Sequence, residues 1–212
     1  MVVVMKAFLF LVSLLMAVPA YALTIDEMSD SEADDLERGI EAMEKKEYAT
    51  ARHKFLPLAI KGNPSAQLYI GVMFLLGNGL NTDACEGVKW IDRAAREGDT
   101  DAQMMMASIL SDVSWGHRPD YHRSYGWLIT AIQNGATDIK KKAYVLTPNI
   151  QDLFKVLDEK LTKVEMLKIK NEVTDGRFDI KTPANEYIVR IREYHVGEHV
   201  IPIAPCTRLY PD

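Results

Sequence analysis

Two histidines and a cysteine near the C-terminus are the residues of this sequence best suited to binding a metal ion. His195 and His199 lie four residues apart, and Cys206 follows them. On a helix such a pair of histidines shares one face and can hold zinc. Gly197 and Pro202 disfavour a helix here, and no glutamate follows His195. We therefore expect solvated histidines and predict no metal site.

Cys85 and Cys206 are the two cysteines of the chain. In an oxidising compartment an even number of cysteines permits one disulfide, and this bond would fasten the C-terminal segment to the middle of the chain. The alternative is two separate thiols, with Cys85 packed and Cys206 exposed.

Other residue types that serve catalysis have simpler explanations. No serine lies in a Gly-x-Ser-x-Gly frame, and Gly77-Asn78-Gly79 lacks the lysine and hydroxyl residue of a phosphate loop. Met104–Met106 could bind copper, but consecutive helical residues point in different directions, which favours core packing. Lys140–Lys142 is either a solvated face or a contact for an acidic partner. Three further histidines are expected at the surface or at a helix cap: His53, His117 and His122. We predict no catalytic residue and no cofactor.

The N-terminal segment has the pattern of a secretory signal. Lys6 precedes an apolar run from Ala7 to Val18, and Ala20-Tyr21-Ala22 supplies a small-x-small cleavage site. The run has about a dozen residues, too few to span a hydrocarbon core of ~30 Å as a helix. We predict a signal peptide over residues 1–22 and a periplasmic or secreted protein without stable membrane insertion. An uncleaved membrane anchor is the alternative.

The charge of the chain is acidic. Its 212 residues carry 30 Asp and Glu against 25 Lys and Arg. This balance argues against binding to duplex nucleic acid, which needs a basic face, and against adsorption to anionic lipid. Much of the acidity lies between Asp26 and Glu37, where carboxylates are favoured near the positive end of a first helix.

The elements of the chain follow from an internal repeat. Gly62–Gln67 and Gly98–Gln103 share glycine, alanine and glutamine at a spacing of 36 residues, which is typical of helical-pair repeats. Trp90 and Trp127 each lie eight residues before a glycine, the second of these being Gly135. We expect both indoles to fill the space between one helical pair and the next.

Physical chemistry accounts for the other repeated residues. A glycine just after the last helical turn can adopt the left-handed conformation that ends a helix. Asn63-Pro64 and Asp99-Thr100 then offer groups that cap the next helix. Ala94 and Ala131 precede the glycines by four residues, where a small side chain lets two helices approach. Stacked pairs of this kind build one continuous core.

These motifs resemble a known repeat. The run Ala66–Gly79 is similar to the first half of a Sel1-like repeat, and Gly87–Gly98 is similar to the second half. Asp120–Trp127 fits a third unit, although Ser114-Trp115-Gly116 replaces the usual glycine-rich turn. The resemblance covers about residues 32–142. It implies an α-solenoid related to tetratricopeptide repeats, which is generally a protein-binding scaffold without shared catalytic residues.

The resemblance also implies where a partner would bind. The first helices of the pairs usually line the concave surface of such a solenoid. Four residues of these helices are therefore predicted to contribute to partner binding: Tyr69, Met73, Met105 and Ile109. The expected partner is another envelope protein or peptide, and the oligomeric state stays open.

The C-terminal part is expected to close the solenoid. Apolar spacing predicts helices over 137–146, 149–161 and 163–173, and 186–192 has the pattern of a strand. We predict an all-α fold with an extended, partly β tail. The segments are a signal peptide over 1–22, helical repeats over 23–142, capping helices over 143–175 and a tail over 176–212.

One rival function places the activity in the tail. The chain would then be an envelope hydrolase or an inhibitor of one, and deletion from Gly176 onward would abolish activity without loss of helicity. This hypothesis requires Tyr187, His195, Glu198 and His199 to converge into a pocket. No residue of a catalytic motif supports its enzymatic form.

Overall fold

The computed structural model describes residues 29–112, 119–136, 149–178, 193–196 and 199–202. The elements in this part of the chain are α2 (Asp30–Glu44), α3 (Tyr48–Ile60), α4 (Pro64–Leu76), α5 (Ala84–Arg96), α6 (Thr100–Ser111), α7 (Tyr121–Gln133), α8 (Ile150–Lys160), α9 (Lys163–Thr174), β1 (Glu193–Val196) and β2 (His199–Pro202). The predicted signal peptide lies outside the described residues.

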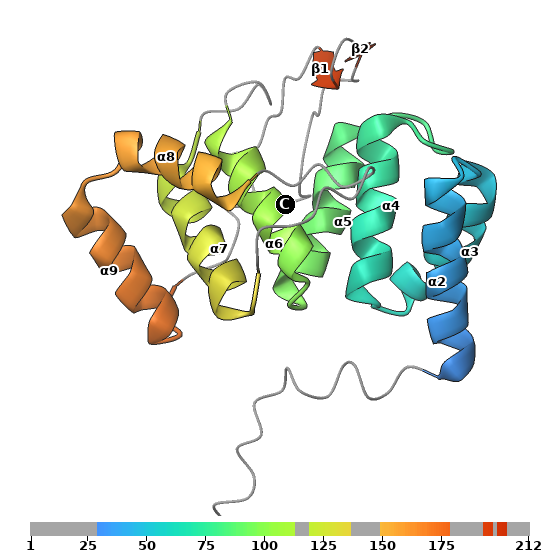
Figure 1. Cartoon of the computed structure of the whole chain (residues 1–212), viewed down its shortest axis with the longest axis horizontal. Coiled ribbons are helices and arrows are strands. Elements are labelled where there is room, and N and C mark those ends of the chain that lie inside the picture. The colour runs from blue at the N-terminus through green and yellow to red at the C-terminus, as the bar shows by residue number, and fades with distance from the viewer. Residues whose placement is uncertain (1–28, 113–118, 137–148, 179–192, 197–198, 203–212) are drawn as a thin grey trace, which may run out of the picture.

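The helices stack as pairs into one row. α2 packs against α3, α4 against α5 and α6 against α7, while α3·α4 and α5·α6 join each pair to the next. α2 and α3 lie at one end of the row and α8 and α9 at the other (Figure 1). The predicted α-solenoid is confirmed.

The junctions between pairs have the predicted geometry. Asn63 Oδ1 accepts a hydrogen bond from Ala66 N at 2.9 Å, and Asp99 Oδ1 accepts one from Ala102 N at 2.9 Å. The glycines before these caps and at the end of α7 have positive φ angles of 98°, 97° and 93°: Gly62, Gly98 and Gly135. The repeated residues of the sequence therefore end one helix and begin the next.

The paired helices approach closely where they carry glycine. A Cβ atom added to Gly71 of α4 would lie 2.8 Å from Gly87 O of α5, and one added to Gly87 would lie 2.9 Å from Gly71 O. Neither position has room for a side chain, so the α4–α5 crossing depends on both glycines. The repeat spacing had indicated this role only for the alanines.

The core runs along the whole stack, and it corrects one prediction. Met104–Met106 are buried, as expected for core methionines, and Trp127 is buried. Trp90 is only partly buried, although its spacing matches that of Trp127. The indole of Trp90 therefore packs on the core from the outside and does not fill a gap within it.

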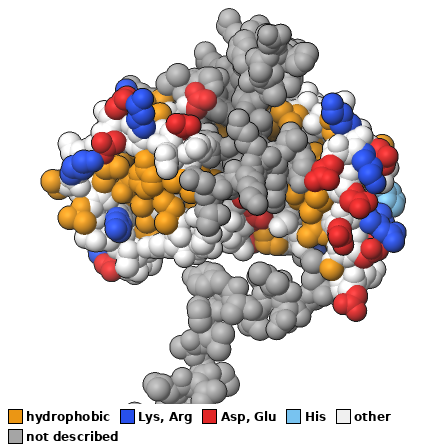
Figure 2. Space-filling model, in the orientation of Figure 1, with side chains coloured by type: hydrophobic (Ala, Val, Ile, Leu, Met, Phe, Trp, Pro, Cys, Tyr) orange, Lys and Arg blue, Asp and Glu red, His pale blue; other side chains and the backbone are white. Residues whose placement is uncertain are grey.

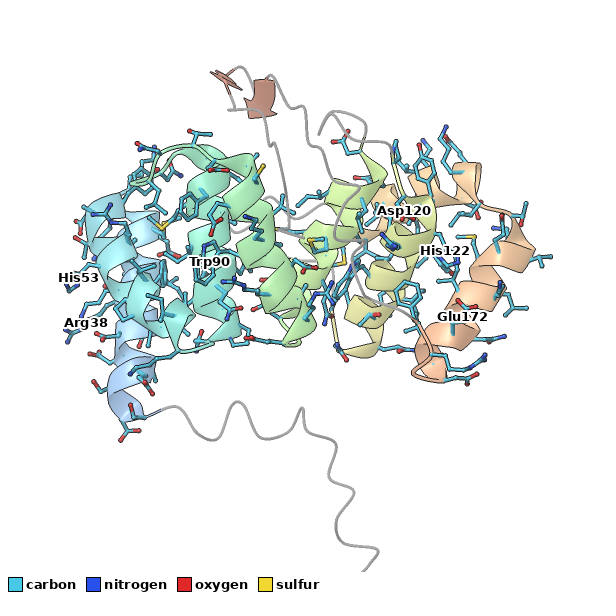
Figure 3. All side chains as sticks on the ribbon, turned by 180° about the vertical axis from the view of Figure 1, so that it is seen from behind. Arg38, His53, Trp90, Asp120, His122 and Glu172 are labelled. Atoms are coloured by element: carbon cyan, nitrogen blue, oxygen red, sulfur yellow. The ribbon has the colours of Figure 1, made fainter. Side chains whose placement is uncertain are left out.

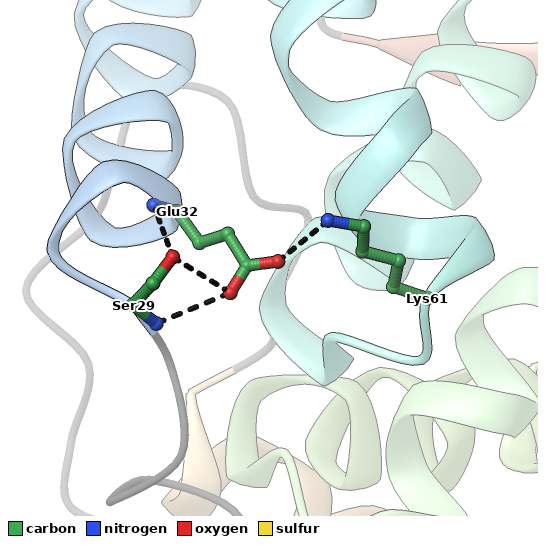
Figure 4. A network of polar contacts seen from close by, with 3 residues as sticks. All are labelled: Ser29, Glu32 and Lys61. Carbon is green, nitrogen blue, oxygen red and sulfur yellow. Dashed lines mark hydrogen bonds and ion pairs between the residues drawn. The ribbon is translucent and has the colours of Figure 1, made fainter.

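The N-terminal end of the solenoid is tied by polar contacts (Figure 4). Ser29 Oγ accepts a hydrogen bond from Glu32 N, and the Glu32 carboxylate accepts one from Ser29 N at 3.1 Å, which completes a capping box. The same carboxylate accepts a hydrogen bond from Lys61 Nζ at 2.7 Å. These contacts, with Lys61 first, lower the pKa of Glu32. The acidic N-terminal stretch thus starts a capped helix.

The C-terminal part agrees with the sequence where the structure describes it. α8 and α9 confirm the helices predicted over 149–161 and 163–173. The expectation that His195 and His199 do not lie on a helix is also confirmed, because β1 and β2 form an antiparallel hairpin there. The segments predicted as a helix over 137–146 and a strand over 186–192 lie outside the described residues. No helix of the described ranges is long and apolar enough to cross a membrane.

Candidate partner-binding surfaces

The four residues predicted to line a concave binding surface are buried. Tyr69, Met73, Met105 and Ile109 are each at most 4% exposed. The Tyr69 ring stacks on Phe55 of α3 with 4.6 Å between the ring centroids. These side chains pack in the core and are not on the surface of this structure, so their binding to a partner stays a prediction that the structure does not test.

On α5, a partly exposed indole lies beside an exposed guanidinium. Trp90 is partly exposed, and the guanidinium of Arg93 lies 4.9 Å from the centre of its ring. A cation over an indole face is attracted by the ring quadrupole and restrains both side chains. Figure 3 shows Trp90 within the stack, between His53 at one end and His122 toward the other.

Two ion pairs flank Trp90 along the same helix. Lys89 Nζ lies 3.4 Å from Glu86 Oε2, and Arg96 Nε lies 2.7 Å from Asp92 Oδ2. The Asp92 side chain is buried, whereas the guanidinium of Arg96 is partly exposed. The indole therefore lies among side chains of both charges, and it suits a partner that covers the ring with an apolar side chain and supplies polar groups around it.

Two buried glutamines connect successive pairs. Gln67 of α4 donates from Nε2 to Ala59 O of α3 at 3.4 Å, and Gln103 of α6 donates from Nε2 to Ala95 O of α5 at 3.0 Å. Gln103 Oε1 accepts a hydrogen bond from Asn134 Nδ2 at 3.2 Å. The shared Ala-Gln pair of the repeat was the sequence signal for these bonds, but its polar role was not recognised.

The carboxylates at the junction of the second and third pairs have raised pKa values. Burial raises the pKa of Asp99. Hydrogen bonds from Ala102 N and the Ser65 hydroxyl lower this pKa, but their effect is smaller than that of burial. Burial also raises the pKa of Glu97, while a hydrogen bond from the Gln67 amide and the charge of Arg93 lower it. Gln67 Oε1 is buried without a hydrogen-bond partner.

The described histidines do not gather into a catalytic site. His53 and His122 are both exposed, as expected, and lie at opposite ends of the molecule (Figure 3). No group of three His, Cys, Asp or Glu side chains within the described residues could hold a metal ion. His117 and Lys140–Lys142 lie outside the described residues. The same is true of Tyr187 and Glu198 and of the side chains of the two C-terminal histidines, so the structure does not test the pocket of the rival hypothesis.

Cys85 lies in the first turn of α5. Its side chain is buried, which agrees with a packed position. Cys206 lies outside the described residues. The disulfide between Cys85 and Cys206 therefore stays a prediction.

Comparison with known proteins identifies the fold. The sequence matches no family model, and no curated protein is significantly similar to it. Among solved structures, the chain is similar to c5321, a protective antigen present in uropathogenic Escherichia coli strains that displays an SLR fold, with a TM-score of 0.54 and 21% sequence identity. The similarity covers 70% of this chain and 30% of c5321, so this chain spans less than a third of its neighbour. Together with the stacked helical pairs and the repeated junction residues, this similarity shows that the chain has the Sel1-like repeat fold.

Proposed function

We propose that this protein is an exported, non-catalytic scaffold that binds another protein of the bacterial cell envelope. The observation that carries the proposal is the partly exposed indole of Trp90 on α5, with the exposed Arg93 beside it. Solenoids of helical pairs present extended surfaces that suit protein binding. The signal-like segment that ends at Ala22 supports export.

Trp90 has the properties of a binding hot spot. Tryptophan and arginine are enriched among the residues that dominate interface energies. The equivalent indole in the next pair, Trp127, is buried and already used by the core. Trp90 still has apolar surface that a partner can cover. Arg93 restrains the indole, so less side-chain entropy is lost on binding.

The proposal is tested by crosslinking in intact cells of the source organism. A photoreactive residue placed at Lys89 should capture one dominant envelope protein, which mass spectrometry of the purified adduct identifies. Trp90→Ala should reduce this capture at least tenfold, because a central aromatic anchor typically contributes more than about 1.4 kcal/mol.

The matched control is His53→Ala, an exposed substitution on α3 at one end of the stack. It should leave the capture unchanged, and circular dichroism should show equal helicity for both variants. Recovery of the chain alone, or capture that does not depend on Trp90, would contradict the proposal and shift attention to the tail.

Export is tested separately by cell fractionation and by the mass of the mature protein. A chain that begins at Leu23 in the periplasmic or secreted fraction is expected. A chain that keeps residues 1–22 in the membrane fraction would instead support the uncleaved anchor.

A further inference from the structure

The last described helix carries an apolar face that no other described residue covers. α9 packs against α7 through Met166 and Ile169, which are buried. Val164 and Leu167 lie on the opposite side of the helix and are 78% and 60% exposed. Figure 2 shows hydrophobic side chains interspersed with Lys and Arg at the end of the molecule that α8 and α9 form. A terminal helix of a solenoid normally turns a polar face outward.

The other end of the solenoid follows that rule. α2 buries Gly39, Ala42 and Met43 and turns the opposite face to solvent. This outward stripe is exposed along the whole helix and consists of carboxylates: Asp30, Asp34, Glu37, Glu41 and Glu44. The N-terminal helix thus has no exposed apolar stripe like the valine and leucine of α9, although Ile60 on the neighbouring α3 is also exposed.

The apolar face of α9 is bordered by lysines. Lys163, Lys168 and Lys170 are exposed and lie next to the Val164–Leu167 face at helical spacing. Lys163 pairs with Asp158 and Lys168 lies 3.9 Å from Glu172 Oε1, but both pairs are exposed and leave the ammonium groups in water. The border is thus accessible positive charge.

The carboxylates of α9 do not offset this border. Glu165 accepts hydrogen bonds from Thr162 N at 2.8 Å and from Thr162 Oγ1 at 2.7 Å. These bonds complete the cap at the start of the helix and lower the pKa of Glu165. Glu172 is largely covered, with 24% of its side chain exposed. The surface offered to a partner is an apolar strip between ammonium groups.

We propose that this face of α9 binds an acidic amphipathic helix of another protein. Leucines of that helix would cover Val164 and Leu167, and glutamates beside them would meet the lysines, as in helix pairs with charged flanks. A second copy of the chain does not fit, because pairing α9 with itself in either direction brings lysine against lysine. Two apolar side chains are also too few to hold a helix in a lipid surface. The surface is separate from Trp90, so either can fail without the other.

The test uses the full mature protein and two designed helical peptides labelled with a fluorophore. Both carry the same leucines at heptad positions a and d; one has glutamates and the other lysines at e and g. Fluorescence anisotropy at low salt should show binding of the glutamate peptide at least tenfold tighter than of the lysine peptide.

Substitutions then locate the site. Leu167→Gln should weaken binding of the glutamate peptide about tenfold, as expected for loss of a central apolar contact. The triple change Lys163→Glu, Lys168→Glu and Lys170→Glu should reverse the preference between the peptides. The matched control is Ile60→Gln, which changes a residue of similar exposure, 70%, at the opposite end of the stack.

Several results would overturn the proposal. These are equal binding of the two peptides, absence of glutamate-peptide binding, or binding that Leu167→Gln and Ile60→Gln weaken alike. Sedimentation showing a dimer of the free protein that Leu167→Gln dissociates would assign the face to a second copy. Cosedimentation with phosphatidylglycerol vesicles that depends on Leu167 would assign it to a lipid surface.

Discussion

The two glutamines of the repeat lie in equivalent places but in different polar surroundings. Gln103 uses both ends of its amide, because Nε2 donates to Ala95 O and Oε1 accepts from Asn134 Nδ2. Gln67 makes a longer bond from Nε2 to Ala59 O and a bond from its amide to the Glu97 carboxylate, but its Oε1 is buried without a donor.

The difference lies in the residue before the next glycine. That residue is Asn134 for Gln103 and Glu97 for Gln67. An amide can donate to Oε1, whereas an ionised carboxylate can only accept. In one junction, therefore, the glutamine Oε1 accepts a hydrogen bond, and in the other it has no donor; we call these the complete and the incomplete junction. The loss of stability caused by the missing donor depends on whether Glu97 is protonated.

The largest predicted change in stability comes from removing the amide of Gln103. Gln103→Leu should lower the free energy of unfolding by about 2 kcal/mol, because it removes two hydrogen bonds of a buried amide. Gln67→Leu should cost about 1 kcal/mol, because it removes the long bond to Ala59 O and the bond to the Glu97 carboxylate but also removes an unpaired buried oxygen. Urea unfolding followed by circular dichroism measures both. Equal losses would show that the two junctions are energetically alike.

A smaller effect is expected from the hydroxyl that links the same two pairs. Ser65 Oγ donates to Asp99 Oδ2 at 3.0 Å, and Asp101 and Ala136 occupy the corresponding positions one repeat later. Ser65→Ala should lower the free energy of unfolding by about 1 kcal/mol, since it removes one hydrogen bond of a largely buried carboxylate. The exposed Ser31→Ala should change it little. If Ser65→Ala lowers the free energy of unfolding no more than Ser31→Ala does, the bond between Ser65 and Asp99 does not stabilise the junction.

Exchanging the residues that face the two glutamines should make the two junctions more alike in their contribution to stability. Glu97→Gln provides an amide hydrogen for Gln67 Oε1 and should raise the free energy of unfolding by about 0.5 kcal/mol. Asn134→Asp removes the donor to Gln103 Oε1 and should lower it by a similar amount. Urea unfolding at pH 7 tests the pair. Two changes of the same sign would contradict the role given to the missing hydrogen.

Sequence patterns predicted the elements of this fold better than its surfaces. Glycine after a helix and Asn63 or Asp99 before the next one act locally, so their spacing predicted the junctions, and Met104–Met106 were placed correctly in the core. Exposure depends on how neighbouring pairs stack, which one repeat does not encode. For this reason Trp90 was expected inside the stack but is only partly buried.

The smallest predicted effect is a pH dependence confined to the incomplete junction. Burial raises the pKa of Glu97 above its ordinary value of 4.5, so the folded protein binds this proton more tightly than the unfolded chain does. The resulting stability is present below pH 4.5 and is lost as the pH rises through the folded pKa. The advantage of Glu97→Gln should therefore be largest at pH 7 and shrink toward pH 4.5, as the protonated carboxyl supplies its own hydrogen to Gln67. The pKa values of Glu32, Asp35 and Glu165 are lowered, so these groups lose their stabilising effect as the pH falls. Because the wild-type protein and Glu97→Gln both contain them, this effect cancels in the difference between the two unfolding free energies. A difference in unfolding free energy that stays constant with pH would show that Glu97 keeps its charge at this junction, and the two glutamines would then differ by geometry alone.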